Sequence, residues 1–323
     1  MIITRTPFRV SFAGGGSDLR DFYSRNGYGA VVSTAINKYM YIVIHPYFHD
    51  KIRVKYSITE DVEEVDEIRH PIVRECLRKV QIERGIEIAS FADVPAGTGL
   101  GSSSAFTVGL LNALYAYKGK VVSKERLARE ACDIEIERLG EPIGKQDQYA
   151  TAYGNINYIR FSKDETVDVT PIFLTESSRK SLEEKLCLYY TGGERKASDI
   201  LEEQKRNISN EDKFSSLQKI VNLTDALRDS LQEGDLDSLG PILHKGWQLK
   251  KELSKRISTD GINRLYDKFI KSGAEGGKLL GAGSTGFLLI YSNKHDRLQR
   301  FFGLKVLPFN IDREGTKIIF YDQ

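Results

Sequence analysis

The stretch from residue 93 to residue 105 constrains the fold and the chemistry of this chain more than any other. It runs Asp-Val-Pro-Ala-Gly-Thr-Gly-Leu-Gly-Ser-Ser-Ser-Ala, after an expected strand at 86–92 and into an expected helix at 102–117. Its glycines allow close backbone approach and positive φ angles, and N–H groups at a helix N-terminus attract anions. No Gly-Lys-Ser/Thr follows, so it is not a Walker A loop. The stretch predicts phosphate binding, with a serine-capped glycine turn as the structural alternative.

Two further glycine turns adjoin expected strands. Residues 13–18 run Ala-Gly-Gly-Gly-Ser-Asp after a strand at 2–12, and residues 278–287 run Lys-Leu-Leu-Gly-Ala-Gly-Ser-Thr-Gly-Phe. Each turn is weak evidence alone, because many junctions between strands contain glycine. Three such turns in one chain predict a nucleotide site with several walls.

The composition excludes other classes of function. The chain has 323 residues, with 47 Lys and Arg against 45 Asp and Glu, so no strong field favours nucleic acid or an anionic membrane. No apolar stretch approaches the ~20 residues of a membrane span, and Arg5 and Arg9 lie where a signal peptide would be apolar. Three distant cysteines favour buried thiols in a reducing compartment. We therefore expect a cytoplasmic protein that binds neither nucleic acid nor membrane.

The order of the expected elements divides the chain into two lobes. The first half is rich in strands, residues 195–271 are nearly all helical, and strands return after residue 278. This pattern is typical of an α+β chain. We place the boundary within 160–195 and divide the chain into lobes at 1–180 and 181–323.

The three glycine turns, in this order, resemble the motifs of the GHMP kinase superfamily. Residues 95–105 match its Pro-x-x-x-Gly-Leu-Gly/Ser-Ser-Ser-Ala pattern at every defining position, and Arg-Thr-Pro-Phe-Arg-Val at 5–10 matches its first motif. The glycines within 281–286 match the third motif, although Ser284-Thr285 stand where two further glycines are usual. The resemblance covers nearly the whole chain.

This resemblance implies a two-lobed GHMP kinase fold, with a ribosomal S5 domain 2-like N-terminal lobe and a ferredoxin-like, helical C-terminal lobe. It also implies ATP and Mg²⁺ as cofactors, with ATP lying between the glycine motifs. The nucleotide-binding residues that it implies are Pro95, Gly97, Gly99, Leu100, Gly101, Ser102, Ser103, Ser104, Gly281 and Gly283.

The catalytic residues follow from the same resemblance. Asp147 matches the carboxylate that faces the acceptor hydroxyl, and Arg9 is its expected partner, because a nearby cation keeps a carboxylate ionised and stabilises charge during phosphoryl transfer. Glu135 matches the Mg²⁺-binding carboxylate, and Ser104 the serine that shares the metal, with Ser103 as the alternative. Glu137 is the rival acid, but two positions later on a helix it points away from Glu135 and better fits a solvated helix face. The structural alternatives are a helix N-cap for Asp147 and an outward strand position for Arg9.

One branch of the superfamily fits best. Residues 13–18, 140–148, 244–251 and 276–281 resemble D-glycero-D-manno-heptose 7-phosphate kinases. Those enzymes phosphorylate the anomeric O1 of the heptose 7-phosphate, and the product feeds nucleotide-activated heptose for surface polysaccharides. L-fucokinases share the same motifs, whereas galactokinases carry Glu-His in place of Gly15-Gly16.

A heptose phosphate requires contacts to its hydroxyls and basic groups far from O1. Asp18 matches the acceptor of sugar hydroxyl groups, with a helix N-cap as its alternative role. Trp247 lies on one helical face with two polar residues and forms either a sugar platform or part of the core. The expected substrate-binding residues are Asp18, Gly15, Gly16, Lys145, Arg195, Lys196 and Trp247, with Lys250 and Lys251 as further basic candidates.

The sequence thus predicts an ATP- and Mg²⁺-dependent kinase for O1 of a heptose 7-phosphate. A kinase for another sugar, such as L-fucose, is one alternative. A non-catalytic sugar or ATP sensor on the same fold is another, against which the presence of Asp147, Glu135 and Ser104 argues. The expected partners are a sugar phosphate and ATP, and the oligomeric state is left open, with a homodimer as one option.

Overall fold

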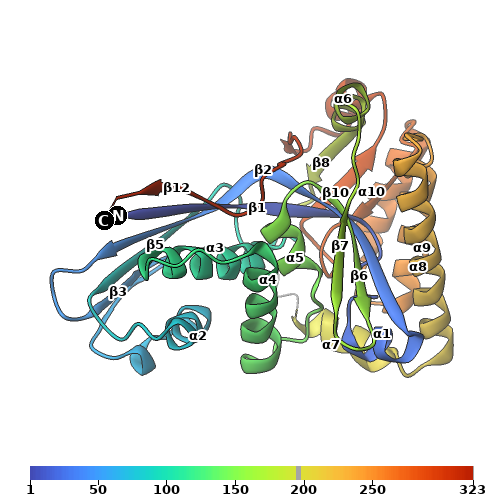
Figure 1. Cartoon of the computed structure of the whole chain (residues 1–323). Helices are drawn as coiled ribbons and strands as arrows, with labels where there is room; N and C mark the ends of the chain where they lie inside the picture. Colours follow the sequence, from blue (N-terminus) through green and yellow to red (C-terminus); the bar gives the residue numbers. More distant parts are fainter. Residues whose placement is uncertain (194–197, 323) are drawn as a thin grey trace.

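The computed structural model describes residues 1–193 and 198–322 as two sheets with helices packed against them (Figure 1). The first part of the chain forms β1 (Ile2–Ala13), α1 (Arg20–Asn26), β2 (Tyr28–Pro46), β3 (Ile52–Lys55), β4 (Thr59–Val62), η1 (Val65–Glu67), α2 (Pro71–Val80), β5 (Ile86–Ala92), α3 (Ser102–Tyr117), α4 (Lys124–Cys132), η2 (Asp133–Arg138), α5 (Gln146–Tyr153), β6 (Ile156–Ser162) and β7 (Val167–Pro171). The second part forms α6 (Glu176–Lys185), β8 (Leu186–Tyr190), α7 (Ser198–Asn207), α8 (Glu211–Gln232), α9 (Leu239–Leu253), α10 (Asp260–Lys271), β9 (Gly276–Leu279), β10 (Phe287–Tyr291), α11 (His295–Phe302), β11 (Val306–Leu307) and β12 (Lys317–Tyr321).

The larger sheet has the strand order β12-β1-β2-β5-β3-β4, with β6 paired to β2 and β7 to β6. β1 and β2 are long antiparallel neighbours, whose register shifts between Pro7 and Phe8. β2 is one continuous strand of 19 residues and pairs with β1 along most of its length. Helices α2 to α5 lie along one face of this sheet (Figure 1).

Helix α3 begins at Ser102 and anchors the end of the phosphate loop. Twelve of its 16 residues are buried, because it lies between the sheet and helices α2, α4 and α5. Thr4 of β1 donates a hydrogen bond of 2.9 Å to the carbonyl oxygen of Gly109, so the helix approaches the strand closely where no side chain intervenes. A fixed helix N-terminus is what an anion site needs.

The helical stretch from Lys124 to Arg138 is divided into two parts. Helix α4 begins at a Ser123 cap, whose hydroxyl accepts from the N–H of Arg126 at 3.2 Å, and ends at Cys132. The π-helical segment η2 follows, and such segments are frequent at functional sites. It buries Glu135 and exposes Glu137, two positions later.

The second sheet, β11-β8-β10-β9, is antiparallel and packs against the helices of the second half. The last strand, β12, returns to pair with β1 of the larger sheet, so the C-terminal segment does not stay with this second unit. The division at residue 180 falls within α6 and stays a prediction. Within the described ranges, no helix combines the length and the apolar character that crossing a bilayer requires.

Candidate active site

A cavity of about 840 Å³ lies where the three glycine turns meet. All three turns contribute to its wall, as the sequence predicted for a site with several walls. Of the expected nucleotide-binding residues, those in the wall are Gly97, Gly99, Gly101, Ser102, Ser103, Ser104, Gly281 and Gly283. Pro95 is exposed outside the cavity, and Leu100 is buried behind it, where its carbonyl oxygen accepts from the N–H of Arg9 at 3.0 Å.

The glycine turn within residues 93–105 and the one within residues 278–287 contact each other through backbone atoms, with no side chain between them. A Cβ atom on Gly281 would lie 2.6 Å from the Cα of Gly99, and a Cβ on Gly99 would lie 2.6 Å from the carbonyl oxygen of Leu280. Gly99 and Gly281 have positive φ angles, 85° and 72°. Only glycine permits this approach, so these residues fix the distance between the two turns. Ser284, which replaces a glycine of the usual motif, also has a positive φ of 74°.

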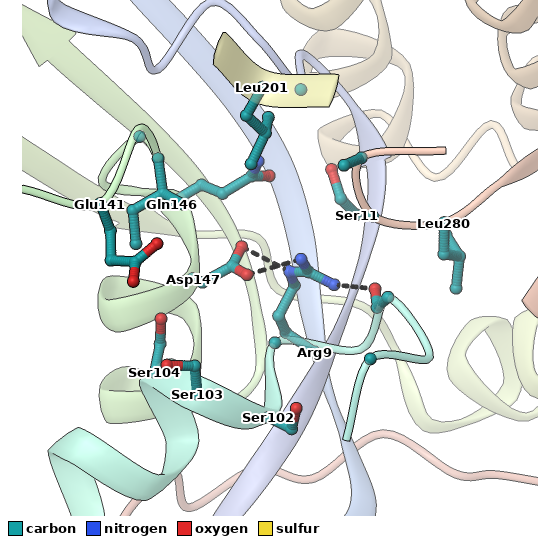
Figure 2. A pocket seen from close by; sticks show the side chains of 18 of the residues that line it. Arg9, Ser11, Ser102, Ser103, Ser104, Glu141, Gln146, Asp147, Leu201 and Leu280 are labelled. Carbon is teal, nitrogen blue, oxygen red and sulfur yellow. Dashed lines mark hydrogen bonds and ion pairs between the residues drawn. The ribbon is translucent and has the colours of Figure 1, made fainter. Parts of the chain in front are cut away.

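Arg9 and Asp147 form a bidentate ion pair in the cavity wall (Figure 2). The Nε and Nη2 atoms of Arg9 each donate to one carboxylate oxygen of Asp147 at 2.6 Å. The third arm, Nη1, donates to the carbonyl oxygen of Gly99 at 2.6 Å. Arg9 comes from β1 and Asp147 from the first turn of α5, so 138 residues separate the partners. The structure brings the pair together as the sequence predicted, and their catalytic roles are treated below.

Glu135 lies behind the serines of the phosphate loop. It is 1% exposed, and its carboxylate accepts from Ser103 Oγ at 2.6 Å, from Ser104 Oγ at 2.9 Å and from Gln148 Nε2 at 2.6 Å. Burial raises the pKa of Glu135, against the opposing effect of these three donors. Both serines therefore have the same partner, and the choice of Ser104 over Ser103 has no geometric basis here.

The oxygen atoms around Glu135 fit Mg²⁺. The set comprises one carboxylate and two hydroxyl groups, and the buried Oε1 of Gln148 has no hydrogen-bond partner among the described residues. Mg²⁺ prefers oxygen ligands and seldom has a cage made of protein alone. Within residues 1–193 and 198–322, no three or more His, Cys, Asp or Glu side chains are grouped so that they could hold a metal ion by themselves. Ser103, Ser104 and Glu135 would hold the ion.

Asp18 joins the first glycine turn to the start of α5. It is 3% exposed, and its oxygens accept from the N–H of Gly16 at 2.9 Å and from the N–H of Gln146 at 3.3 Å. Burial raises its pKa above the usual range. Asp18 does not cap α1, whose N-cap is Leu19 without a side-chain bond, so the structural alternative considered for it is not observed. Gly15, Gly16 and Asp18 all line the cavity, and their role in binding substrate stays a prediction.

The remaining expected substrate residues lie elsewhere. Lys145 pairs with Glu165 and lies outside the cavity wall. Trp247 of α9 is fully buried against Tyr266 and does not line the cavity, so the prediction that it contacts sugar is wrong and the core alternative holds. Trp247 belongs to a buried apolar cluster of the second half that also includes Tyr266 and Phe269. Arg195 and Lys196 fall outside the described residues.

Several residues of the wall were not assigned a role from the sequence. They are Ser11 and Gln146, each with a buried oxygen that has no partner among the described residues, together with Glu141 and Lys278. Figure 2 shows Ser11 and Gln146 on one side of the Arg9–Asp147 pair and the loop serines on the other. Only Lys278 could have been singled out from the sequence. It lies between Gly277 and Leu279 in an expected strand, where a charged residue is rare.

Two family models match this chain. The model of the GHMP kinases N terminal domain matches residues 69–155, and that of the GHMP kinases C terminal domain matches residues 227–305. Together they match just over half of the 323 residues. The chain belongs to the GHMP kinases. It is therefore a phosphotransferase with an alcohol group as acceptor, and GHMP kinases use ATP.

Similar proteins are found among GHMP kinases that act on sugars. The D-glycero-alpha-D-manno-heptose 7-phosphate kinase of Campylobacter jejuni is 29% identical over 98% of each chain. The bifunctional fucokinase/GDP-fucose pyrophosphorylase of Arabidopsis thaliana is 26% identical over 90% of this chain and 30% of that protein. The crystal structure of a D-glycero-D-manno-heptose 1-phosphate kinase from Bacteroides thetaiotaomicron superposes with a TM-score of 0.81, at 23% identity over 100% of each chain. The expected two-lobed GHMP kinase fold is confirmed.

The Gly101→Ala substitution is expected to damage this kinase site locally. A Cβ on Gly101 would lie 3.1 Å from Arg9 Cγ and 3.2 Å from Asp147 Oδ2, so it would press on the ion pair. On the catalytic role proposed below for this pair, displacing it by a fraction of an ångström should lower kcat by about 10- to 100-fold. A steady-state assay of ADP release would measure this.

Gly119→Ala is the matched control, because Gly119 also has a positive φ, of 66°, but open space around its Cβ. Both variants should lose about 1 kcal/mol of stability, since alanine is strained in this conformation. Only Gly101→Ala should lose activity. Equal kcat values in the two variants would contradict the importance of the ion pair.

Proposed function

We propose that this GHMP kinase transfers the γ-phosphoryl group of ATP to the anomeric O1 of D-glycero-D-manno-heptose 7-phosphate. The observation that carries the proposal is the end-to-end similarity to a heptose 7-phosphate kinase, which covers 98% of both chains. The coarser statement, that the chain is a sugar kinase, is also supported by its similarity to fucokinases and galactokinases.

In this proposal, Asp147 accepts the proton of the attacking hydroxyl. Its carboxylate lines the cavity and is held by two short bonds from Arg9, so its direction is fixed before substrate arrives. The guanidinium is itself anchored on Gly99, in the loop that is expected to surround the nucleotide phosphates. Arg9 can thus stabilise the negative charge on the transferred group while it keeps Asp147 ionised.

Ser103, Ser104 and Glu135 would hold Mg²⁺ against the ATP phosphates. When bound, the ion supplies positive charge to the β- and γ-phosphate oxygens. The two hydroxyl groups line the cavity, and Glu135 orients them from behind. The N-terminus of α3 adds its own partial positive charge at the same place.

The sugar would bind on the side of Asp147 away from the Mg²⁺ site, against Gly15, Gly16 and Asp18. There Asp18 can accept hydrogen bonds from sugar hydroxyl groups. Arg195 and Lys196 stay candidates for the distal phosphate, whereas Lys145 is already paired with Glu165. In this proposal the product feeds nucleotide-activated heptose for surface polysaccharide synthesis in the cytoplasm.

An assay of ADP release with Mg-ATP tests the proposal directly. The four acceptors to compare are D-glycero-D-manno-heptose 7-phosphate, the unphosphorylated heptose, mannose 6-phosphate and L-fucose. We expect turnover with the heptose 7-phosphate at a kcat/KM at least about 10²-fold above the others, because a site built for a phosphate loses charge-assisted bonds when it is absent. NMR of the product should place the new phosphate on O1.

The same assay separates the alternative functions. Preferred turnover of L-fucose would make the protein a fucokinase, an alternative that the 26% identity to a fucokinase favours. Binding of ATP without turnover of any acceptor would favour the sensor. The assembled Arg9, Asp147 and Glu135 argue against a sensor, since a protein that only binds has no need of this geometry.

A further inference from the structure

Two buried lysines in the cavity wall have no role in the mechanism described so far. Lys250 of α9 is 8% exposed and Lys278 of β9 is 5% exposed, and both line the cavity. Lysine is rarely buried, because removing an ammonium group from water is unfavourable unless a partner compensates. Both charges therefore require compensation from their surroundings.

The partners of the two ammonium groups are few. Lys250 Nζ donates to the carbonyl oxygen of Gly281 at 2.8 Å. The ammonium group of Lys278 makes no hydrogen bond and no ion pair with any residue in 1–193 or 198–322. Of the nearby carboxylates, Asp147 is bound by Arg9, whereas Asp18 accepts only from two neutral backbone N–H groups, which cancel no charge. When all these groups are ionised, the three cations Arg9, Lys250 and Lys278 outnumber the two carboxylates.

Lys250 lies close to the glycine turn at residues 13–18, where the sugar acceptor is proposed to bind. A Cβ on Gly15 would lie 3.7 Å from Lys250 Nζ and 3.8 Å from Gln146 Nε2, so these groups converge over the first glycine turn. That turn is across the Arg9–Asp147 pair from Ser103 and Ser104, as the place of Gln146 in Figure 2 shows. Lys250, which lies near Gln146, is thus on the side of that pair away from the serines of the expected Mg²⁺ site.

We propose that Lys250 and Lys278 form a second anion subsite, which binds a phosphate group of one of the substrates. The group is either the phosphate carried by the acceptor sugar or the phosphoryl group in transfer, and the experiment below separates these sources. The first case rests on the proposed function, because only a phosphorylated acceptor can supply that group. A phosphate can accept from both ammonium groups at once, which supplies the missing counter-charge.

The electrostatics of the cavity agree with an anion subsite. Burial and the Arg9 charge together lower the pKa of Lys250 to about 8, against the opposing effect of the Asp18 and Asp147 carboxylates. Burial and the neighbouring Lys250 lower the pKa of Lys278. The charged groups facing Lys250 are thus Arg9 from β1, Asp18 from the turn after it, Asp147 from α5 and Lys278 from β9. A bound phosphate would reverse the effect on both lysines and draw protons onto them.

Calorimetric binding to Lys250→Met and Lys278→Met tests the inference. Two affinity ratios are measured in each protein: Mg-ATP against Mg-ADP, and mannose 6-phosphate against mannose, with the heptose 7-phosphate and its heptose alongside. Each ratio compares two ligands in one protein, so a general weakening of the fold cancels. Lys251→Met is the matched control, because Lys251 neighbours Lys250 on α9 but does not line the cavity.

We expect both variants to lower one of the two ratios by about 10-fold or more, the usual effect of removing a charged hydrogen-bond partner. A lower sugar-phosphate ratio identifies the acceptor's phosphate, and a lower ATP/ADP ratio identifies the transferred group. In wild type the same ratio should fall as the pH rises through about 8, where Lys250 loses its proton. Lys250→Met should remove that pH dependence.

Ratios within about two-fold of wild type in both variants would overturn the inference, since a charged partner contributes more than that. Lys278→Met is the sharper variant, since Lys250→Met also removes the partner of the Gly281 carbonyl. Lys278→Arg keeps the charge and should keep most of the preference, which tests for misfolding. The proposed function is judged separately: it fails if wild type does not turn over the heptose 7-phosphate, whereas the ATP/ADP ratio still tests the lysines.

Discussion

Asp147→Asn should lower kcat by about 10³-fold, within the range that proton transfer by a positioned side chain contributes. Asparagine has the shape of aspartate, but its amide cannot accept the proton of the acceptor hydroxyl. Its NH₂ group also faces one of the two Arg9 donors that bind the carboxylate at 2.6 Å. ATP affinity should stay within a few-fold of wild type, because the glycine loops are untouched. Steady-state assays and calorimetry measure the two effects.

A double-mutant cycle shows whether Arg9 and Asp147 act as one unit. Arg9→Met removes the partner, and Arg9→Met combined with Asp147→Asn removes both. If the pair acts together, the double variant should be little worse than Asp147→Asn alone, because residues that act as a unit are not additive. Fully additive losses would mean separate roles. Asp147→Asn activity within a few-fold of wild type would exclude Asp147 as the base.

The glycine turns were predictable because their function requires particular residue types in the sequence. Gly99 and Gly281 touch through backbone atoms alone, so no other residue could stand there, and the pattern is visible without a structure. The Arg9–Asp147 contact was inferred from motif resemblance. Its bidentate geometry was not, since it depends on how β1 meets α5 across 138 residues.

Other features could not be predicted, because local patterns do not specify what a face packs against. The face of α9 that carries Trp247 has helical periodicity, yet periodicity alone does not distinguish a core from a cavity. The cavity instead receives Lys250, on the adjacent face. Likewise, nothing in residues 123–139 marks the change from α-helix to π-helix after Cys132, which buries Glu135 behind Ser103.

Glu135→Gln should raise the Mg²⁺ concentration for half-maximal activity by at least about 10-fold, as expected when a group that orients or binds a metal is removed. The reason lies in the donors around the carboxylate. Ser103, Ser104 and Gln148 all donate to it, so the NH₂ group of the substituted amide would face at least one donor instead of an acceptor. The serine hydroxyls then lose the partner that sets their direction.

The loss in Glu135→Gln should affect the metal site rather than the fold. Because burial raises the pKa of Glu135, the ionised carboxylate is unfavourable in the folded protein at neutral pH, and stability increases as the pH falls toward that pKa. A neutral amide of the same shape avoids this cost, so the unfolding temperature at neutral pH should not fall greatly. Glu137→Gln is the matched control, since Glu137 is exposed on the same π-helical segment. If Mg²⁺ titrations of the two variants coincide, Glu135 does not contribute to metal binding and the ion must be held by other oxygens of the cavity, among which the Glu141 carboxylate also lies in the wall.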